Sequence, residues 1–191
     1  MKMFKLIGAS AMMVAASGAT TAFAADKVDL GKREAHAEII ETRAADTEPR
    51  VRLTLFQGLP KAEKMDLIIQ KTVELGVSMI VPVVTQRSVV RPDENKWDRR
   101  LERWNRIAAE AAKQCRRAVV PKVAAPVSLR EALDVSGNAA AALVLYENEQ
   151  KKCLKELLKC YNINKIGDIA LFIGPEGGFS KEEIDEMTGF G

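Results

Sequence analysis

The sequence predicts an α/β fold with a mostly parallel sheet, and two observations carry that prediction. From Val51 onward, short apolar runs typical of strands alternate with segments of helical period, an order that favours parallel strands joined by helices. The last of these runs ends in the glycine turn "GPEGG", and open α/β sheets bind ligands at the carboxyl ends of their strands. A chain of 191 residues has room for one such domain and an appendage.

The elements follow in chain order from the apolar patterns. A strand is predicted over residues 35–41, "AHAEIIE", within a charged segment that cannot form a barrel by itself. Further strands are predicted at 51–57, 78–84, 140–147 and 168–173, and helices at 62–75, 96–118, 128–133 and 151–159. Ser180 and Glu183 have the spacing of a capping box, which predicts a last helix that starts after Ser180.

The first 25 residues have the pattern of a secretory signal peptide. Lys2 and Lys5 precede an apolar run that ends at Ala16, and Ala-Phe-Ala stands before Ala25. We therefore expect residues 1–25 to be a leader outside the fold, and one interpretation is an exported protein with an unrelated task. No segment has the roughly 18 uninterrupted apolar residues of a membrane-spanning helix, so no membrane span is expected.

Charge and the metal-ligating residue types narrow the function classes. Lys and Arg exceed Asp and Glu by 29 to 26, a balance too even to indicate a nucleic-acid partner from total charge. The three cysteines form no C-x-x-C pair and fit reduced thiols better than a disulfide framework. The single histidine, His36, excludes a His-rich metal site, and no metal is expected.

Residues 96–118 predict an amphipathic helix with a basic face. Apolar residues recur along it at steps of four and three, at Trp97, Leu101, Trp104, Ala108, Ala111, Cys115 and Ala118. A second stripe is basic and comprises Arg99, Arg103, Arg106, Lys113 and Arg117. Two interpretations stay open: a solvated helix face, or a track for nucleic-acid phosphates that Arg87 and Arg91 would extend.

The glycine turn after residues 168–173 predicts a ligand floor. Gly174, Gly177 and Gly178 let backbone groups approach a ligand, because a side chain there would intrude on it or demand a disfavoured backbone conformation. The spacing matches neither a dinucleotide fingerprint nor a phosphate-binding P-loop. The alternative is a tight strand-to-helix turn that needs no ligand.

Three stretches together resemble one known family. The turn "IGPEGGFSKEE" is similar to the glycine loop of the ribosomal RNA small subunit methyltransferase E family, which belongs to the knotted SPOUT class. Residues 64–89, "KMDLIIQKTVELGVSMIVPVVTQRSV", resemble the family's first helix–strand unit. Residues 106–121, "RIAAEAAKQCRRAVVP", match its E-A-A-x-Q-x-x-R segment at Glu110, Gln114 and Arg117.

The resemblance implies transfer of a methyl group from S-adenosylmethionine to ring nitrogen N3 of a uridine in small-subunit (16S) ribosomal RNA. It implies a cytoplasmic homodimer with a SPOUT-like sheet, helices on both faces and the cofactor held in a trefoil knot. The cofactor-binding residues it implies are Leu145, Tyr146, Glu147, Ile173, Gly174, Pro175, Glu176, Gly177 and Gly178. The RNA-binding residues are Arg87, Arg91, Arg99, Arg103, Arg106 and Arg117.

Two residues are candidates for the chemical step. The uridine imide must lose its proton, which calls for a cation that stabilises the anion or a carboxylate that accepts the proton. Arg117 and Glu176 are the catalytic candidates in these two roles. For each of them, the alternative is a structural ion pair or a cap.

Both ends of the chain depart from the family pattern. Residues 26–50 resemble only the last strands of the family's PUA-like RNA-binding barrel, and the chain stops before the L-G-x-R-I-L-R-x-E-T segment that closes the knot. We therefore expect a leader at 1–25, a barrel remnant at 26–50, and a methyltransferase domain at 51–191 that lacks its C-terminal end. The alternative to an active enzyme is an inactive fragment or an RNA-binding module that keeps the basic helix without cofactor binding.

Overall fold

The structure is a computed structural model that describes residues 21–30, 35–44, 47–61, 64–88, 94–149, 154–160 and 167–190. Contacts divide the chain into two compact units. The smaller comprises Met1–Glu48 with Ala112–Val120, and the larger comprises Pro49–Ala111 with Pro121–Gly191.

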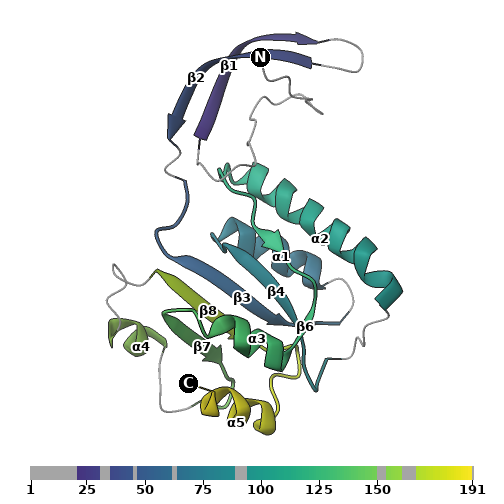
Figure 1. Cartoon of the computed structure of the whole chain (residues 1–191), viewed down its shortest axis with the longest axis vertical. Coiled ribbons are helices and arrows are strands. Elements are labelled where there is room, and N and C mark those ends of the chain that lie inside the picture. The colour runs from purple at the N-terminus through teal and green to yellow at the C-terminus, as the bar shows by residue number, and fades with distance from the viewer. Residues whose placement is uncertain are drawn as a thin grey trace. The chain divides into compact units, whose positions relative to one another are not determined.

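The larger unit contains a six-stranded sheet in which every pair of neighbouring strands is parallel, as Figure 1 shows. Its strands run in the order β5-β4-β3-β8-β7, and β6 also pairs with β4. Their bounds are β3 Arg52–Gly58, β4 Met79–Val84, β5 Lys122–Val123, β6 Val127–Ser128, β7 Ala141–Leu145 and β8 Asp168–Ile173. The predicted mostly parallel sheet is confirmed, and the short strands β5 and β6 were not among the predicted elements.

Five helices connect or follow these strands in the described part of the chain. They are α1 Lys64–Glu74, α2 Glu94–Gln114, α3 Leu129–Ser136, α4 Leu154–Cys160 and α5 Lys181–Gly189. The predicted capping box at the start of α5 is confirmed, since the Ser180 hydroxyl accepts from the Glu183 N–H and the Glu183 carboxylate accepts from the Ser180 N–H. Helix α3 has the same device at Ser128 and Glu131.

Successive residues of a strand point to opposite faces of the sheet, and each face packs against different helices. Phe56 and Phe172 stack with ring centroids 4.5 Å apart, in one cluster with Leu133 of α3 and Met187 of α5. Strand neighbours point to opposite faces, so Leu55 lies against the other side, where Figure 1 shows α1. Helices therefore cover both faces, as the SPOUT-like fold requires.

Helix α2 ends four residues earlier than predicted. Arg116 follows it with φ of 57°, a left-handed conformation that stops a helix. Along α2, Trp104, Ala108 and Ala111 are buried, which confirms the predicted apolar stripe.

The smaller unit contains an antiparallel pair of strands, β1 Thr21–Leu30 and β2 Ala35–Ala44. Strand β2 contains the predicted strand at 35–41 and places His36 opposite Asp29. Strand β1 starts at Thr21, so the last five residues of the predicted leader lie in a strand, while residues 1–20 lie outside the described residues. Among the described helices, none has the length and apolar character needed to cross a bilayer.

Candidate functional site

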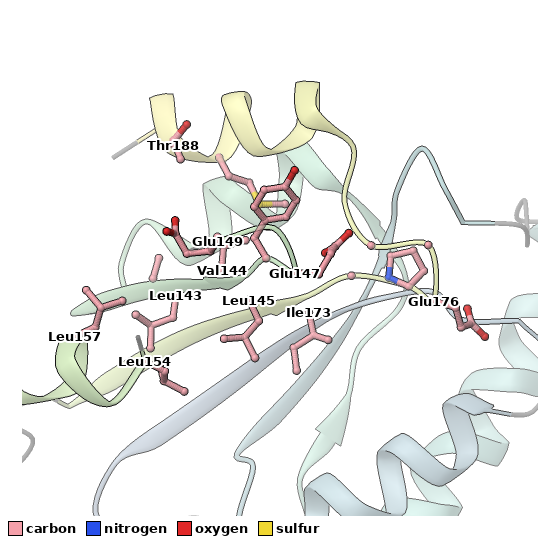
Figure 2. A pocket seen from close by; sticks show the side chains of 17 residues that line it. Leu143, Val144, Leu145, Glu147, Glu149, Leu154, Leu157, Ile173, Glu176 and Thr188 are labelled. Atoms are coloured by element: carbon pink, nitrogen blue, oxygen red, sulfur yellow. The ribbon is translucent and has the colours of Figure 1, made fainter. Parts of the chain in front are cut away.

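A cavity of about 840 Å³ lies at the carboxyl ends of β7 and β8 (Figure 2). Its wall contains residues from both strands, from the turns that follow them, and from α4 and α5. This is the edge at which open α/β sheets bind ligands, and the volume falls within the roughly 300–1,000 Å³ typical of small-molecule sites.

All nine residues that the sequence predicted for the cofactor site lie in the wall of this one cavity. They are Leu145, Tyr146, Glu147, Ile173, Gly174, Pro175, Glu176, Gly177 and Gly178. The parallel register explains why two distant segments meet, because Leu145 is directly paired with Ile173 at the ends of β7 and β8. Their role in binding a cofactor stays a prediction.

Eight further lining residues were missed by the sequence analysis. They are Ala142, Leu143, Val144, Glu149, Leu154, Leu157, Met187 and Thr188. Figure 2 shows that Leu143, Leu154 and Leu157 gather at one end of the cavity. The pattern of α4 contained a usable signal, since Leu154 and Leu157 are three positions apart and therefore share one face of a helix.

The glycines of the turn bring backbone to the cavity. Gly178 donates its N–H to the Pro175 carbonyl at 2.8 Å and has φ of +67°. A Cβ at Gly178 would lie 2.0 Å from Oε1 of Glu147, and a Cβ at Gly174 would lie 2.9 Å from the carbonyl carbon of Gly178. Both positions therefore require glycine.

Gly177 differs from its neighbour. It has no positive φ, and a Cβ built on it would make ordinary contact with Cδ of Arg87 at 3.4 Å. The expected conformational requirement thus falls on Gly178 and Gly174, and Gly177 has room for a small side chain.

Strand β3 supports the turn from below. Gln57 is buried, and its side-chain amide donates to the carbonyls of Gly58 at 3.0 Å and Gly174 at 3.2 Å. A Cβ at Gly58 would lie 2.6 Å from Cδ of Pro175, so β3 and the turn are in close backbone contact. The floor of the cavity is therefore held in place by the centre of the sheet.

Glu176 lines the cavity, but its carboxylate is engaged by the segment after β3. It forms an ion pair with Nζ of Lys64 at 2.7 Å and accepts from the Lys61 N–H at 3.2 Å. The hydrogen bond from Lys64, with further bonds from backbone N–H groups, lowers the pKa of the Glu176 carboxyl to about 2. These contacts favour the structural alternative for Glu176, since an effective proton acceptor has a pKa near the working pH.

Arg117 is also engaged, within the smaller unit. The residue is only 5% exposed, and its Nη2 lies 2.6 Å from Oε2 of Glu48. Glu48 also accepts from the N–H groups of Ala118 at 3.0 Å and Val119 at 3.1 Å. Burial raises the pKa of Glu48, but Arg117 and these N–H groups outweigh it and leave that pKa below its usual value of 4.5. The geometry favours the structural ion pair, and Arg117 does not share the exposed basic face.

The remaining predicted RNA-binding residues have different surroundings. Arg99, Arg103 and Arg106 are exposed along α2, and Arg103 is ion-paired with Asp66 of α1. Arg87 lies at the glycine turn, where its Nη1 donates to the Gly177 carbonyl at 2.5 Å. Arg91 lies outside the described residues.

Comparison with known proteins agrees with this geometry. The family model described as "RNA methyltransferase domain" matches residues 47–191. The ribosomal RNA small subunit methyltransferases E of Bacillus subtilis and of a Synechocystis strain are 32% and 36% identical to the chain, each over 78% of it. The chain spans 59% and 47% of the length of these two relatives.

A solved structure extends the comparison to three dimensions. The ribosomal RNA small subunit methyltransferase E of Neisseria gonorrhoeae, crystallised with S-adenosylmethionine, superposes with a TM-score of 0.77 at 31% identity. The match covers 91% of this chain and 68% of that one. With its parallel sheet and its glycine turn, the chain thus belongs to the ribosomal RNA small subunit methyltransferase E family.

Proposed function

We propose that the chain binds S-adenosylmethionine in the cavity at the ends of β7 and β8 and methylates N3 of a uridine in small-subunit ribosomal RNA. The observation that carries this proposal is the convergence of two segments, 145–147 and 173–178, on one cavity of about 840 Å³. Relatives that match the chain bear the name of this enzyme, and one was crystallised with this cofactor.

The lining of the cavity fits such a cofactor. Gly174 and Gly178 carry no side chain, so N–H and C=O groups at these positions can recognise adenine and ribose edges. The leucines at the other end supply the apolar contact that small-molecule sites use for most of their area. Glu147 presents a carboxylate near the turn, which suits a ligand that carries positive charge.

The chemistry divides simply between cofactor and protein. S-adenosylmethionine supplies a methyl group that its sulfonium already activates. The chain therefore has to orient two ligands and assist the loss of the imide proton. Glu176 contributes by holding the turn through Lys61 and Lys64, while a catalytic role for Arg117 requires exchange of Glu48 for the substrate.

The RNA is assigned to the exposed arginines of α2. Arg99 and Arg106 offer their guanidinium groups to solvent, whereas Arg103 already has a carboxylate partner in Asp66. Guanidinium groups bind phosphate oxygens in a two-pronged geometry, which suits a track along an RNA backbone. A ribosomal RNA substrate implies action in the cytoplasm. The family resemblance implies a homodimer, and analytical sedimentation would measure this oligomeric state.

The test is methyl transfer to a defined atom. The purified chain is incubated with methyl-labelled S-adenosylmethionine and unmodified small-subunit ribosomal RNA, and the nucleosides are separated and identified by mass spectrometry. We expect label in N3-methyluridine with the wild-type chain and none with Gly178→Val. RNA binding without any cofactor binding would instead support the RNA-binding module.

A further inference from the structure

The turn that follows β4 is fixed to the start of α5. Thr85 and Ser88 close the turn, since the Thr85 N–H donates to the Ser88 hydroxyl at 3.1 Å and the Ser88 N–H donates to the Thr85 carbonyl at 3.1 Å. Between them, the Gln86 N–H donates to Oε1 of Glu183 at 2.7 Å. Glu183 is only 4% exposed and uses its other oxygen for the Ser180 N–H. These hydrogen bonds fix the backbone on both sides of residue 87.

The Arg87 side chain extends from this turn to Gly177 in the glycine turn. Its Nη1 donates to the Gly177 carbonyl at 2.5 Å, and its Cβ and Cδ approach the site of a Gly177 Cβ at 3.5 and 3.4 Å. Gly177 is part of the cavity wall, whereas Arg87 is not. Arg87 thus contacts the proposed cofactor turn at Gly177 without itself being one of the residues that line the cavity.

The same side chain has the chemistry of an RNA contact. A guanidinium has five N–H donors in a planar fork, and the Gly177 carbonyl accepts from one nitrogen of it. The Arg87 side chain is exposed, so a phosphate can reach the fork from solvent. A solvated surface arginine would not donate a hydrogen bond to the Gly177 carbonyl.

We propose that Arg87 is a positioning residue that couples RNA binding to cofactor binding through the Gly177 carbonyl. A phosphate that holds the guanidinium fixes the donor to Gly177, so part of the ordering of the turn is complete before the cofactor binds. The coupling is reciprocal, and the cofactor strengthens RNA binding by the same factor. This inference rests on the proposed function.

The experiment measures S-adenosylmethionine affinity of the 191-residue chain by calorimetry, with and without saturating small-subunit ribosomal RNA. Wild type is compared with Arg87→Gln, with Arg87→Lys, and with Lys181→Gln, which removes an exposed charge beside the same turn. We expect RNA to tighten cofactor binding about fivefold in wild type and in Lys181→Gln. Without RNA, Arg87→Gln should weaken cofactor binding about threefold. Addition of RNA should then leave the cofactor affinity of this variant almost unchanged.

Arg87→Lys separates charge from geometry. Lysine keeps the positive charge for phosphate but has no fork, so we expect RNA affinity within about twofold of wild type and a smaller tightening. Equal tightening in wild type and Arg87→Gln would overturn the inference, as would a wild-type chain whose cofactor affinity ignores RNA. In both cases the cofactor proposal stands, whereas a wild-type chain that binds no S-adenosylmethionine in either condition contradicts the proposed function itself.

Discussion

The glycine turn after β8 and the segment after α2 both bring backbone N–H groups together with a carboxylate, but the two groups of residues differ in their surroundings. At the end of α2, Glu48 uses its oxygens for Arg117, Ala118 and Val119, so the groups satisfy one another. At the glycine turn, residues 174–178 line a space of about 840 Å³. A motif whose polar groups are mutually satisfied is structural, whereas one that faces a cavity is available to a ligand.

Gly178→Val should disturb the glycine turn most strongly. Valine at φ of +67° is strained, and its Cβ would lie 2.0 Å from the Glu147 carboxylate, so that carboxylate or the turn must move. We expect S-adenosylmethionine affinity to fall by more than about 100-fold in calorimetry. Gly177→Ala is the matched control, since the atoms nearest its Cβ belong to the Arg87 stem, at 3.4 Å or more, and its affinity should stay within about threefold of wild type. Equal losses in the two variants would refute the geometry.

Glu48→Gln tests the cluster that Glu48 forms with Arg117, Ala118 and Val119. It removes the negative charge that lies 2.6 Å from the buried Arg117 guanidinium, and we expect the free energy of unfolding to fall by about 3 kcal/mol in urea titrations. The control is Glu74→Gln, which breaks an exposed pair with Lys71 and should cost less than about 0.5 kcal/mol. A similar small loss in both variants would mean that the Glu48 cluster does not stabilise the chain.

The Glu48 cluster also predicts a pH dependence. Because the folded chain holds the Glu48 pKa below its usual 4.5, the stabilisation is complete above pH 4.5 and is lost as the pH falls through the lower, folded value. The stability of Glu48→Gln should therefore fall less steeply than that of wild type in this acid range. Parallel acid-unfolding curves would contradict the assignment.

Glu147→Gln tests whether the cavity recognises positive charge. The cofactor carries a sulfonium, whereas the demethylated product S-adenosylhomocysteine does not, so removal of the carboxylate should affect only the former. We expect about a fivefold loss for S-adenosylmethionine and less than a twofold change for S-adenosylhomocysteine in competition titrations. Equal losses for both molecules would assign Glu147 a role that does not depend on charge.

The smallest expected effect concerns the basic face of α2. Replacement of exposed Arg99 and Arg106 by Gln should flatten the salt dependence of RNA binding by at most about 1.8 units, or 0.9 for each phosphate. Arg103→Gln should change the slope by less than about 0.5 units, because Asp66 already neutralises that charge. Fluorescence anisotropy at several salt concentrations measures both slopes. An unchanged slope in the double variant would favour the alternative in which the basic face of α2 is solvated and does not bind RNA.

Much of the fold was predictable because its signals are local. Strand β8 has the predicted bounds 168–173, and α5 starts after Ser180 as its capping box indicates. The end of α2 was not predictable, since Arg116 turns left-handed after it and the next N–H groups bond to Glu48, which lies 70 positions before Ala118. The start of β1 at Thr21 depends on pairing with β2, and the leader-like composition of residues 1–25 concealed it.

The candidate site divides in the same way. Resemblance located the two segments that meet in the cavity, and parallel strand order explains their meeting at residues 145 and 173. The partners of charged side chains could not be predicted from the sequence. The ion pair of Lys64 with Glu176 and the hydrogen bond of Arg87 to Gly177 both depend on how separate loops pack. Backbone conformation was likewise hidden, and only the structure distinguishes Gly178 from Gly177.

The proposed occupant of the cavity at the ends of β7 and β8 is S-adenosylmethionine. Titration of the ¹⁵N-labelled chain with S-adenosylmethionine, followed by amide NMR spectra, tests it residue by residue. We expect the largest saturable shifts at residues 145–147 and 173–178, with small changes on the exposed face of α2. An absence of shifts, or shifts concentrated on α2 while the two lining segments stay unchanged, would contradict the account.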